Sequence, residues 1–346
     1  MRFIIKGILL LSILIQGCSK KDSESEVYHL ERNNLIDISP FIQEVSIKNR
    51  LGKVVLLEIT KSYLVICDLM SIDKGIHLYD LRTFKYVNSV AKIGRGPNEI
   101  TRIGEVSYNR KTNELWVPDM AKRIVFKFPL DSLLYEENID PIKGFQIYDS
   151  LALLGHFDFV NDSIIIGNAM KVNSSNNIYV NLVKFNIKSN HISEFGYEHP
   201  EAIEKRSLSS SRFSLKNDII VKGYLRCDLL SILDEKGNLK VNIYGKNWFN
   251  TNKKRSFYEK ISFYDNFILG SYNGDVEIVY DKFKRPQVNP PSKLLVYSLN
   301  GKYKFTLFTK YKFSNFTIDE VNKRIYFVFE DANCHIGYVD LNKVQL

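Results

Sequence analysis

A unit of about fifty residues recurs six times along this chain of 346 residues. In each unit a polar, turn-forming cluster is followed directly by a run of β-branched or aromatic residues, and these runs begin at residues 64, 115, 164, 219, 267 and 325. A second run of the same kind follows after a further turn, as in "IHLYD" at 76–80 and "LLVYS" at 294–298. No stretch after the N-terminal segment keeps a helical period over roughly ten residues. The repeat therefore predicts an all-β chain.

Four strands of five to seven residues, with their turns, fill about fifty residues, and a four-stranded repeat of that length is the unit of a β-propeller. One sheet cannot bury both of its faces alone, so such units pack around an axis, and each gives an innermost strand to a central channel. We therefore predict a single six-bladed β-propeller domain over residues 27–346. The expected innermost strands lie at 54–59, 103–108, 156–160, 212–215, 260–264 and 313–319.

The ring needs one more strand than the last unit supplies. That unit ends at Leu346, soon after its third strand, and an open edge would leave backbone groups unpaired. The segment "FIQEVSI" at 41–47 is spare strand-like material near the N-terminus. We expect it to complete the last blade and so to close the ring by joining the two ends of the chain.

The first residues have the pattern of an export signal. Arg2 and Lys6 precede the apolar run "GILLLSILI" at 7–15, which is short for a membrane span, and Cys18 follows. The placement of Cys18 resembles a bacterial lipobox, in which the leader (1–17) is removed and the cysteine is acylated, so that acyl chains hold the protein at a membrane. A plain signal peptide and an uncleaved anchor are the alternatives. Residues 18–26, "CSKKDSESE", predict a flexible tether.

Three segments, together with the lipobox, carry a resemblance to a known family. They are the loop "GRGPNE" at 94–99, "LWVPDMAKRIVFKFPLDSLL" at 115–134 and "FTIDEVNKRIYFVFED" at 316–331. They resemble the six-bladed, TolB-like β-propeller lipoproteins common in Bacteroidetes, although Asn98 stands where that family often has glycine. The resemblance implies a monomeric lipoprotein of the cell envelope, held at the outer membrane and facing the periplasm or the cell surface. It implies no catalytic residue.

Charge and cysteine content exclude several classes of function. The net charge is +9, and removal of the leader with Arg2 and Lys6 lowers it to +7, but basic residues alternate with acidic ones rather than clustering. We therefore predict no nucleic-acid partner. If Cys18 is acylated, Cys67, Cys227 and Cys334 remain, and an odd number of cysteines cannot all pair within one chain, so disulfide bonds are not the organising principle of the fold.

No residue pattern indicates a metal site or a cofactor site. The six histidines include no pair at i, i+4 spacing, and the chain has no Cys-x-x-Cys. Asp68 and Asp119 end matching strands and Asn168 follows in the third unit, but Gly223 and Ser271 continue the series. A full ring of calcium ligands is therefore missing, and we predict that these aspartates cap turns.

The loop "KIGRGPNEI" at 92–100 looks like a glycine-rich phosphate loop. Its third glycine is replaced by Glu99 or Ile100, no helix follows, and Pro97 removes an amide donor. We interpret it as the connection between the first and second blades. Connections of this kind rim one mouth of the channel, where propellers usually bind ligands, and Arg95 lies on this one.

Basic side chains on such connections, with His156 at the start of an inner strand beside Asp158, are the candidate ligand contacts at the channel mouth. Convergent cations would favour an anionic glycan, a peptide carboxylate or a phosphate, whereas evenly solvated surface charge is the alternative. The predicted contacts are Arg95, Glu99, Arg102, Arg123, His156, Arg212 and Arg255.

The segment at 273–292, with three prolines, is the longest departure from the repeat; it predicts a lid, a partner-binding loop or a long hairpin over the blade edge.

The leading functional hypothesis is a non-catalytic binding or scaffold module with its ligand, or an envelope protein partner, at one mouth of the channel. The alternative is an envelope hydrolase or lyase acting on glycans or esters with acidic residues from several inner strands. A deep channel that holds two carboxylates, or a histidine and carboxylate pair, would favour the enzyme, whereas a shallow basic or aromatic rim would favour binding.

Overall fold

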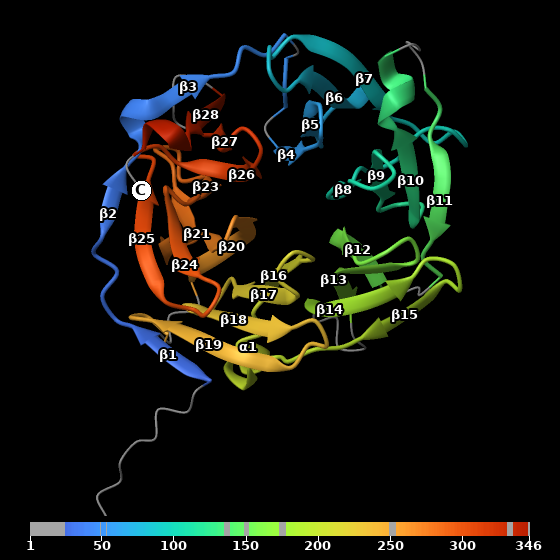
Figure 1. Cartoon of the computed structure of the whole chain (residues 1–346). Helices are drawn as coiled ribbons and strands as arrows, with labels where there is room; N and C mark the ends of the chain where they lie inside the picture. Colours follow the sequence, from blue (N-terminus) through green and yellow to red (C-terminus); the bar gives the residue numbers. More distant parts are fainter. Residues whose placement is uncertain are drawn as a thin grey trace, which may run out of the picture.

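The computed structural model describes residues 25–48, 50–52, 54–134, 139–148, 152–172, 178–248, 254–330 and 335–344. In this part of the chain the strands form six blades around a central axis, with very little helix (Figure 1). The six-bladed β-propeller predicted from the repeat is confirmed. The leader (1–17), Cys18 and the tether as far as residue 24 lie outside the described residues.

Each blade is an antiparallel sheet whose strands follow in chain order from the axis outward. The second strands of blades 1, 2 and 4 are buried at every position, because their β-branched and aromatic residues face the neighbouring blades on both sides. Blades 1 to 3 consist of β4 (Val55–Ile59), β5 (Tyr63–Asp68), β6 (Lys74–Asp80) and β7 (Tyr86–Lys92); β8 (Ser107–Asn109), β9 (Glu114–Asp119), β10 (Ile124–Pro129) and β11 (Ile142–Gln146); and β12 (Ala152–Phe159), β13 (Ile164–Val172), β14 (Ile178–Asn186) and β15 (His191–Glu194).

Blades 4 to 6 continue the same order. They consist of β16 (Ser209–Ser214), β17 (Ile219–Tyr224), β18 (Leu229–Asp234) and β19 (Leu239–Gly245); β20 (Arg255–Tyr264), β21 (Phe267–Val276), β24 (Lys293–Ser298) and β25 (Tyr303–Phe308); and β26 (Phe313–Asp319), β27 (Arg324–Phe329) and β28 (Ile336–Asp340). The innermost strands are those predicted, although β8 begins only at Ser107.

The N-terminal segment runs outside blades 4, 5 and 6 as a belt of three short strands. β3 (Ile42–Glu44) pairs antiparallel with β28, so the predicted closure of the ring is confirmed. β1 (Glu26–His29) and β2 (Leu35–Asp37) were not expected: they pair parallel with β19 and β25 and give blades 4 and 5 a fifth strand. The belt therefore covers the outer edges of three consecutive blades (Figure 1).

Arg32 fastens the belt between β1 and β2. Its guanidinium forms a 2.5 Å ion pair with Asp228, whose side chain is completely buried. It also donates hydrogen bonds to the hydroxyls of Tyr258 (3.0 Å), Tyr297 (3.3 Å) and Tyr272 (3.1 Å), and it lies 4.6 Å from the centre of the Tyr272 ring. One arginine thus ties the belt to residues of blades 4 and 5.

The hydrophobic core lies between neighbouring blades rather than in one centre. Leu57 and Leu64 of blade 1, for example, belong to the same buried cluster as Tyr326 and Val328 of blade 6. The other five pairs of neighbouring blades share clusters of the same kind. This packing leaves the inner strands free to carry polar residues toward the axis.

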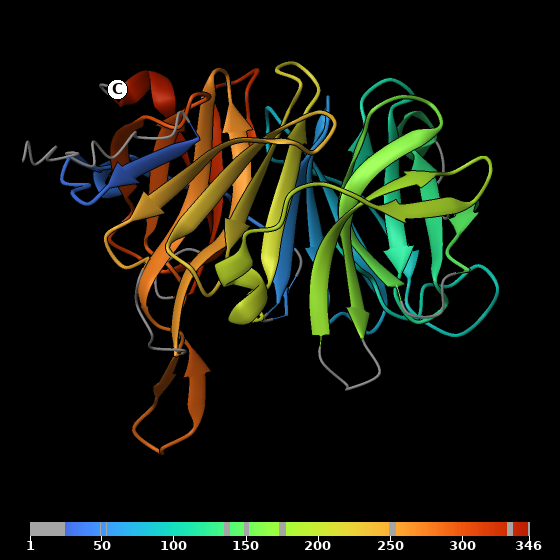
Figure 2. The same cartoon turned by 90° about the horizontal axis from the view of Figure 1, so that it is seen from below.

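Segment 273–292 forms a separate hairpin of β22 (Ile278–Tyr280) and β23 (Pro286–Val288). Figure 2 shows it projecting from one face of the ring, the face at which α1 (Pro200–Glu204) also lies. The remaining helices are the 3-10 turns η1 (Ser39–Phe41), η2 (Leu130–Leu134) and η3 (Leu341–Lys343). Within the described ranges, no helix has the length and apolar character needed to cross a bilayer.

Candidate functional site

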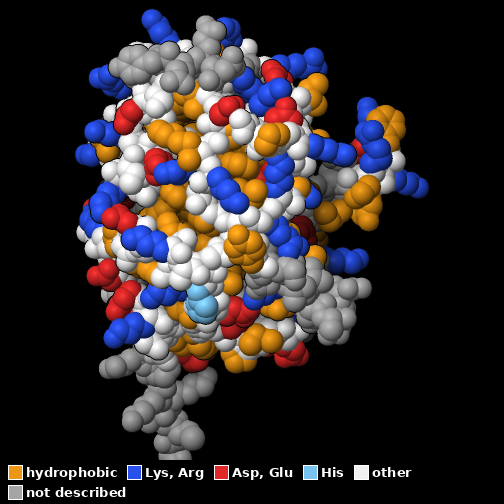
Figure 3. Space-filling model, turned by 90° about the vertical axis from the view of Figure 1, so that its right-hand side faces the viewer, with side chains coloured by type: hydrophobic (Ala, Val, Ile, Leu, Met, Phe, Trp, Pro, Cys, Tyr) orange, Lys and Arg blue, Asp and Glu red, His pale blue; other side chains and the backbone are white. Residues whose placement is uncertain are grey.

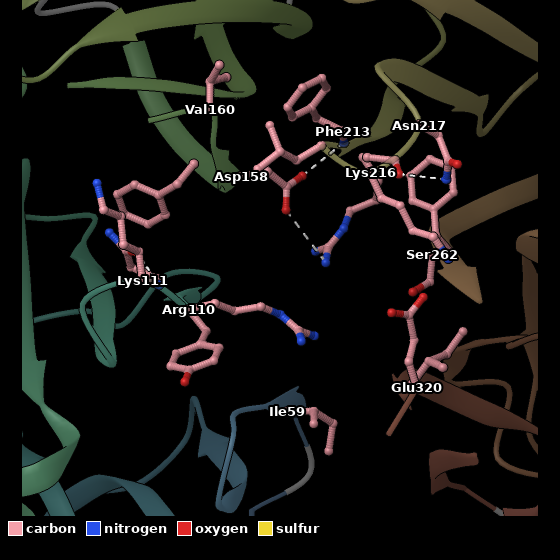
Figure 4. Close-up of a pocket in the computed structure, with 18 of the residues that line it drawn as sticks. Ile59, Arg110, Lys111, Asp158, Val160, Phe213, Lys216, Asn217, Ser262 and Glu320 are labelled. Atoms are coloured by element: carbon pink, nitrogen blue, oxygen red, sulfur yellow. Dashed lines mark hydrogen bonds and ion pairs between the residues drawn. The ribbon is translucent and has the colours of Figure 1, made fainter. Parts of the chain in front are cut away.

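A funnel opens at the end of the axis opposite to the hairpin. It is a cavity of about 580 Å³, lined by the ends of all six inner strands and the turns that lead from the first to the second strand of a blade (Figure 4). Because strands in a blade are antiparallel, these turns and the hairpin between β21 and β24 lie at opposite faces of the ring. The polar clusters of the sequence repeat therefore rim this funnel.

A compact polar cluster lies on its wall. Asp158 of β12 and Arg212 of β16 form an ion pair at 3.8 Å, and Asp158 also accepts a hydrogen bond from the Phe213 amide at 2.9 Å. Burial alone would raise the pKa of Asp158, but Arg212 and His156 outweigh it and lower this pKa to about 2. The carboxylate is therefore ionised at any physiological pH and holds Arg212 in place.

His156 is fully engaged in this cluster. Its Nδ1 donates to the carbonyl of Val106 at 3.1 Å, because a carbonyl can only accept. Its Nε2 meets the guanidinium of Arg212 and lies 3.2 Å from Asp158 Oδ1. Since the ring is buried and both nitrogens are occupied, His156 presents no free nitrogen to a substrate.

Further charges complete a polar layer across the channel. Glu58 of β4 and Glu105, which precedes β8, interact electrostatically with both Arg212 and Lys260 of β20. Burial lowers the pKa of Lys260, which donates a 3.1 Å hydrogen bond to Asn315 of β26. Every blade thus contributes a polar group, and the charges of the two signs largely balance.

Ion pairs between neighbouring blades stiffen the rim. Lys111 of blade 2 pairs with Asp162 of blade 3 at 2.7 Å, and Lys216 of blade 4 pairs with Asp265 of blade 5 at 2.9 Å. Glu320 of blade 6 accepts a hydrogen bond from the Asp265 amide at 3.1 Å. These rim charges already have partners, although such exposed pairs contribute little to stability.

Arg110 differs from the other rim cations. It follows β8, its side chain is exposed, and Figure 4 shows its guanidinium pointing into the middle of the funnel. Among the described residues it has neither a hydrogen-bond nor an ion-pair partner. It is therefore a guanidinium open to a ligand, facing a cavity whose remaining wall includes the apolar side chains of Ile59 and Val160.

The structure separates the residues predicted at the channel mouth. Arg212 and His156 meet in the channel as described, and Arg212 lines the funnel. Arg95, Glu99, Arg102 and Arg123 lie instead on connections at the hairpin face, and Arg255 begins β20 at the same face. Sequence reasoning missed Arg110, because the polar clusters indicate turns between strands and carry no separate signal of ligand binding.

The "KIGRGPNEI" loop connects β7 to β8 and closes on itself. Glu99 forms a 2.8 Å ion pair with Lys92 and accepts a hydrogen bond from the Gly96 amide at 2.9 Å, and this lowers the pKa of Glu99. Lys122 donates to the carbonyls of Gly96 and Glu99, both at 2.6 Å. The interpretation as a blade connection is confirmed, and Arg95 is exposed on it.

The aspartates at matching strand ends cap turns, as predicted. Asp68 accepts hydrogen bonds from the amides of Gly52 and Met70, and Asp119 accepts from four amides: Thr101, Arg102, Ala121 and Lys122. Within the described ranges, no three acidic, histidine or cysteine side chains lie together so that they could hold a metal ion.

Comparisons with known proteins agree on the fold. Among solved structures, the chain is similar to a member of the DUF4221 family from Bacteroides vulgatus, with 11% identity and a TM-score of 0.54 over 87% of this chain and 95% of the other. It is also similar to a luciferin-regenerating enzyme, with 7% identity and a TM-score of 0.56 over 88% of this chain and 96% of the other. At these identities the likeness extends to the fold alone. No curated protein sequence matches the chain.

A family model described as "6-bladed beta-propeller", DUF5128, matches residues 22–241. The resemblance to six-bladed propellers noted in the sequence is thus confirmed, whereas the TolB-like and lipoprotein assignments stay predictions. Because this model covers well over half of the chain, and the described residues form the same six blades, the chain belongs to the DUF5128 family of six-bladed β-propellers.

Proposed function

We propose that the protein is a non-catalytic binding module whose ligand enters the funnel and presents a carboxylate or phosphate to Arg110. The observation that carries the proposal is the guanidinium of Arg110, which has no partner among the described residues and points into a cavity of about 580 Å³. A guanidinium matches the two oxygens of a carboxylate or phosphate in a bidentate geometry. The fixed charges behind it, Asp158 and Arg212, shape the wall rather than compete for the ligand.

Binding is favoured over hydrolysis by the state of the channel groups. The histidine and carboxylate pair that would suit an enzyme is present as His156 and Asp158, but both ring nitrogens are occupied and the carboxylate is held ionised by Arg212. A general base needs a free lone pair that faces the substrate. His156 presents none, because both ring nitrogens are already engaged, and the pair positions Arg212.

The test is calorimetric titration with matched ligands, using the chain from Ser25, which contains every strand of the ring. Glucuronate and glucose differ at one carboxylate, and a short peptide with a free or an amidated C-terminus gives a second such pair. The charged member should bind more tightly, and Arg110→Gln should weaken it by about tenfold or more, since a hydrogen bond to a charged group contributes roughly 1.5–3 kcal/mol.

Arg82→Gln is the matched control, because Arg82 is exposed on the turn between β6 and β7 and does not line the funnel. It should bind like the unchanged chain. Equal binding of charged and neutral members, or equal loss in the two variants, would exclude the role given to Arg110.

We further infer that the protein is a lipoprotein of the cell envelope, anchored through acyl groups on Cys18. The support is the order of basic residues, apolar run and cysteine in residues 1–18. Cys18→Ser should move the protein from the membrane fraction to the soluble fraction of cells, and metabolic labelling with a fatty acid should be lost. Labelling that persists in this variant would contradict the assignment.

A further inference from the structure

The β22–β23 hairpin presents an apolar face to solvent. Ile278 is paired with Val288, and Tyr280 with Pro286, so these four side chains lie on one face of the ribbon. They are also its exposed positions, while Val279 and Gln287 on the other face are half-buried. A two-stranded ribbon gains little stability by itself. An outward apolar face on such an element indicates a surface that is covered by something else.

The tip of the hairpin combines aromatic and basic side chains. Tyr280 is 70% exposed and Phe283 is 65% exposed, and the cationic groups of Lys282 and Arg285 lie 5.0 Å from the centre of the Phe283 ring. The acidic residues of the ribbon are already neutralised, since Asp281 pairs with Arg285 at 2.7 Å and Glu277 pairs with Arg226 at 2.5 Å. The ammonium groups of Lys282 and Lys284 have no carboxylate partner within the described ranges, so the tip is net positive.

The rest of this face, nearer to the ring than the hairpin tip, also carries exposed apolar and basic side chains. Exposed apolar side chains occur on connections from several blades: Met70 and Ile72 in blade 1, Tyr148 after blade 2, Ile178 in blade 3 and Ile203 on α1. Exposed basic residues, including Arg95 and Lys310, lie on connections that end at the same face. Figure 3 shows the hairpin projecting to the right, with hydrophobic and basic side chains side by side.

We propose that this face docks on a bilayer that contains anionic lipids, with the hairpin tip inserted at the headgroup level. Tyrosine and phenylalanine favour the membrane interface, and lysines beside them attract anionic headgroups. Three strand residues and a turn carry the tip about 10 Å beyond Glu277, which is comparable to the depth at which interfacial segments bind. Apolar groups spread around the ring match a flat partner better than a compact one, and adjacent lysines would repel a second copy.

This docking fixes the orientation of the funnel. The funnel opens at the face opposite to the hairpin, so a protein docked in this way keeps the funnel mouth turned away from the bilayer and open to solution. The inference does not depend on the ligand at Arg110, which lies at the funnel face, nor on acylation of Cys18, because no observation that supports it involves that residue.

The experiment is co-sedimentation of the chain from Ser25 with vesicles of phosphatidylcholine alone or with phosphatidylglycerol. This chain lacks the apolar leader and Cys18 and contains the whole ring. Binding to anionic vesicles should exceed binding to neutral ones and fall with added salt. Lys282→Ala/Lys284→Ala should lower the partition coefficient about twenty-five-fold, about fivefold for each lysine near the surface. At high salt, where apolar contacts dominate, Tyr280→Ser/Phe283→Ser should lower the partition coefficient more than the lysine changes do.

Matched changes at the funnel face are the controls. Lys236 and Lys302 are exposed on turns there, and Val321 is 81% exposed, so Lys236→Ala/Lys302→Ala and Val321→Ser should leave vesicle binding unchanged. Phe283→Trp adds a fluorophore at the tip, and its emission should shift to the blue only with anionic vesicles. All these variants change exposed side chains and are expected to fold.

Three results would overturn the proposal. The first is absence of binding to anionic vesicles. The second is binding that the funnel-face changes reduce as much as the hairpin changes do. The third is self-association in sedimentation that disappears with Tyr280→Ser/Phe283→Ser while vesicle binding stays the same, since that would assign the hairpin to a second copy of the chain.

Discussion

Replacing Arg32 with alanine should destabilise the ring more than any surface substitution, because it leaves a buried carboxylate without its cation. Asp228 is completely buried, and among the described residues it would keep only the Tyr272 hydroxyl at 3.0 Å and the Asn247 amide at 3.2 Å as donors to Oδ2. Removing one partner of a buried ion pair costs about 3–5 kcal/mol. Three tyrosine hydroxyls would also lose a donor. We therefore expect the free energy of unfolding to fall by about 4 kcal/mol.

The assay is urea unfolding followed by tryptophan fluorescence. With a denaturant dependence of about 3 kcal/mol per molar urea for a chain of this size, the loss should move the midpoint down by somewhat more than 1 M. Arg82→Ala, an exposed arginine, should change stability by less than about 0.5 kcal/mol. Comparing the two variants separates the cost of leaving Asp228 unpaired from the general effect of removing a positive charge.

A double variant separates the two explanations of such a loss. If the unpaired charge of Asp228 is the main cost, Arg32→Met/Asp228→Asn should recover at least half of the stability, because a neutral, well-packed pair often replaces a buried ion pair without penalty. A single-variant loss below about 1 kcal/mol, or a double variant as unstable as Arg32→Ala, would refute this account of the belt.

Three further predictions concern the ring and its turns. A chain that begins at Val54 lacks the belt and leaves the outer edges of blades 4 to 6 open, so size-exclusion chromatography and calorimetry should find no cooperatively unfolding monomer. Burial, and next the carboxylate of Glu277, raise the pKa of Glu259 from 4.5 to about 7. The free energy of unfolding should therefore fall as the pH rises between these two values. Glu259→Gln should remove this pH dependence from the urea midpoints, and it should add up to about 3 kcal/mol of stability at pH 8 but none at pH 4. Asp119→Ala leaves four amides without their acceptor and should cost about 2–3 kcal/mol in thermal unfolding, whereas Asp119→Asn, which keeps an acceptor oxygen, should cost less.

The fold was predictable because its signal repeats. Each run of β-branched residues packs against both neighbouring blades, so the same pattern must recur in every unit. The pairing of the strand at 41–47 was predictable because the last unit supplies only three of the four strands that a blade needs. β1 and β2 escaped prediction because a short parallel outer strand buries little and needs no alternation of its own. Arg32 carries no local signal either, since its partners lie in blades 4 and 5.

The candidate site was less accessible from the sequence. Which of the two channel mouths holds the funnel depends on the side chains that six different blades bring together there, and no spacing along the chain records how they meet. The prediction placed most of its contacts on connections into the inner strands, whereas the funnel is rimmed by the turns after those strands. Lys111 and Asp162 meet across two blades, so their pairing appears only once the ring is closed.

The belt also sets the order in which the ring can be completed. Glu26 pairs with Asn242, Leu35 with Thr306 and Gln43 with Tyr338, so the first strands to be synthesised pair with some of the last. Pairings this distant in sequence carry a large loop-closure entropy and slow folding. The N-terminal strands must therefore wait for their partners: β1 until blade 4 is made, β2 until blade 5 is made, and β3 until the final blade closes the ring.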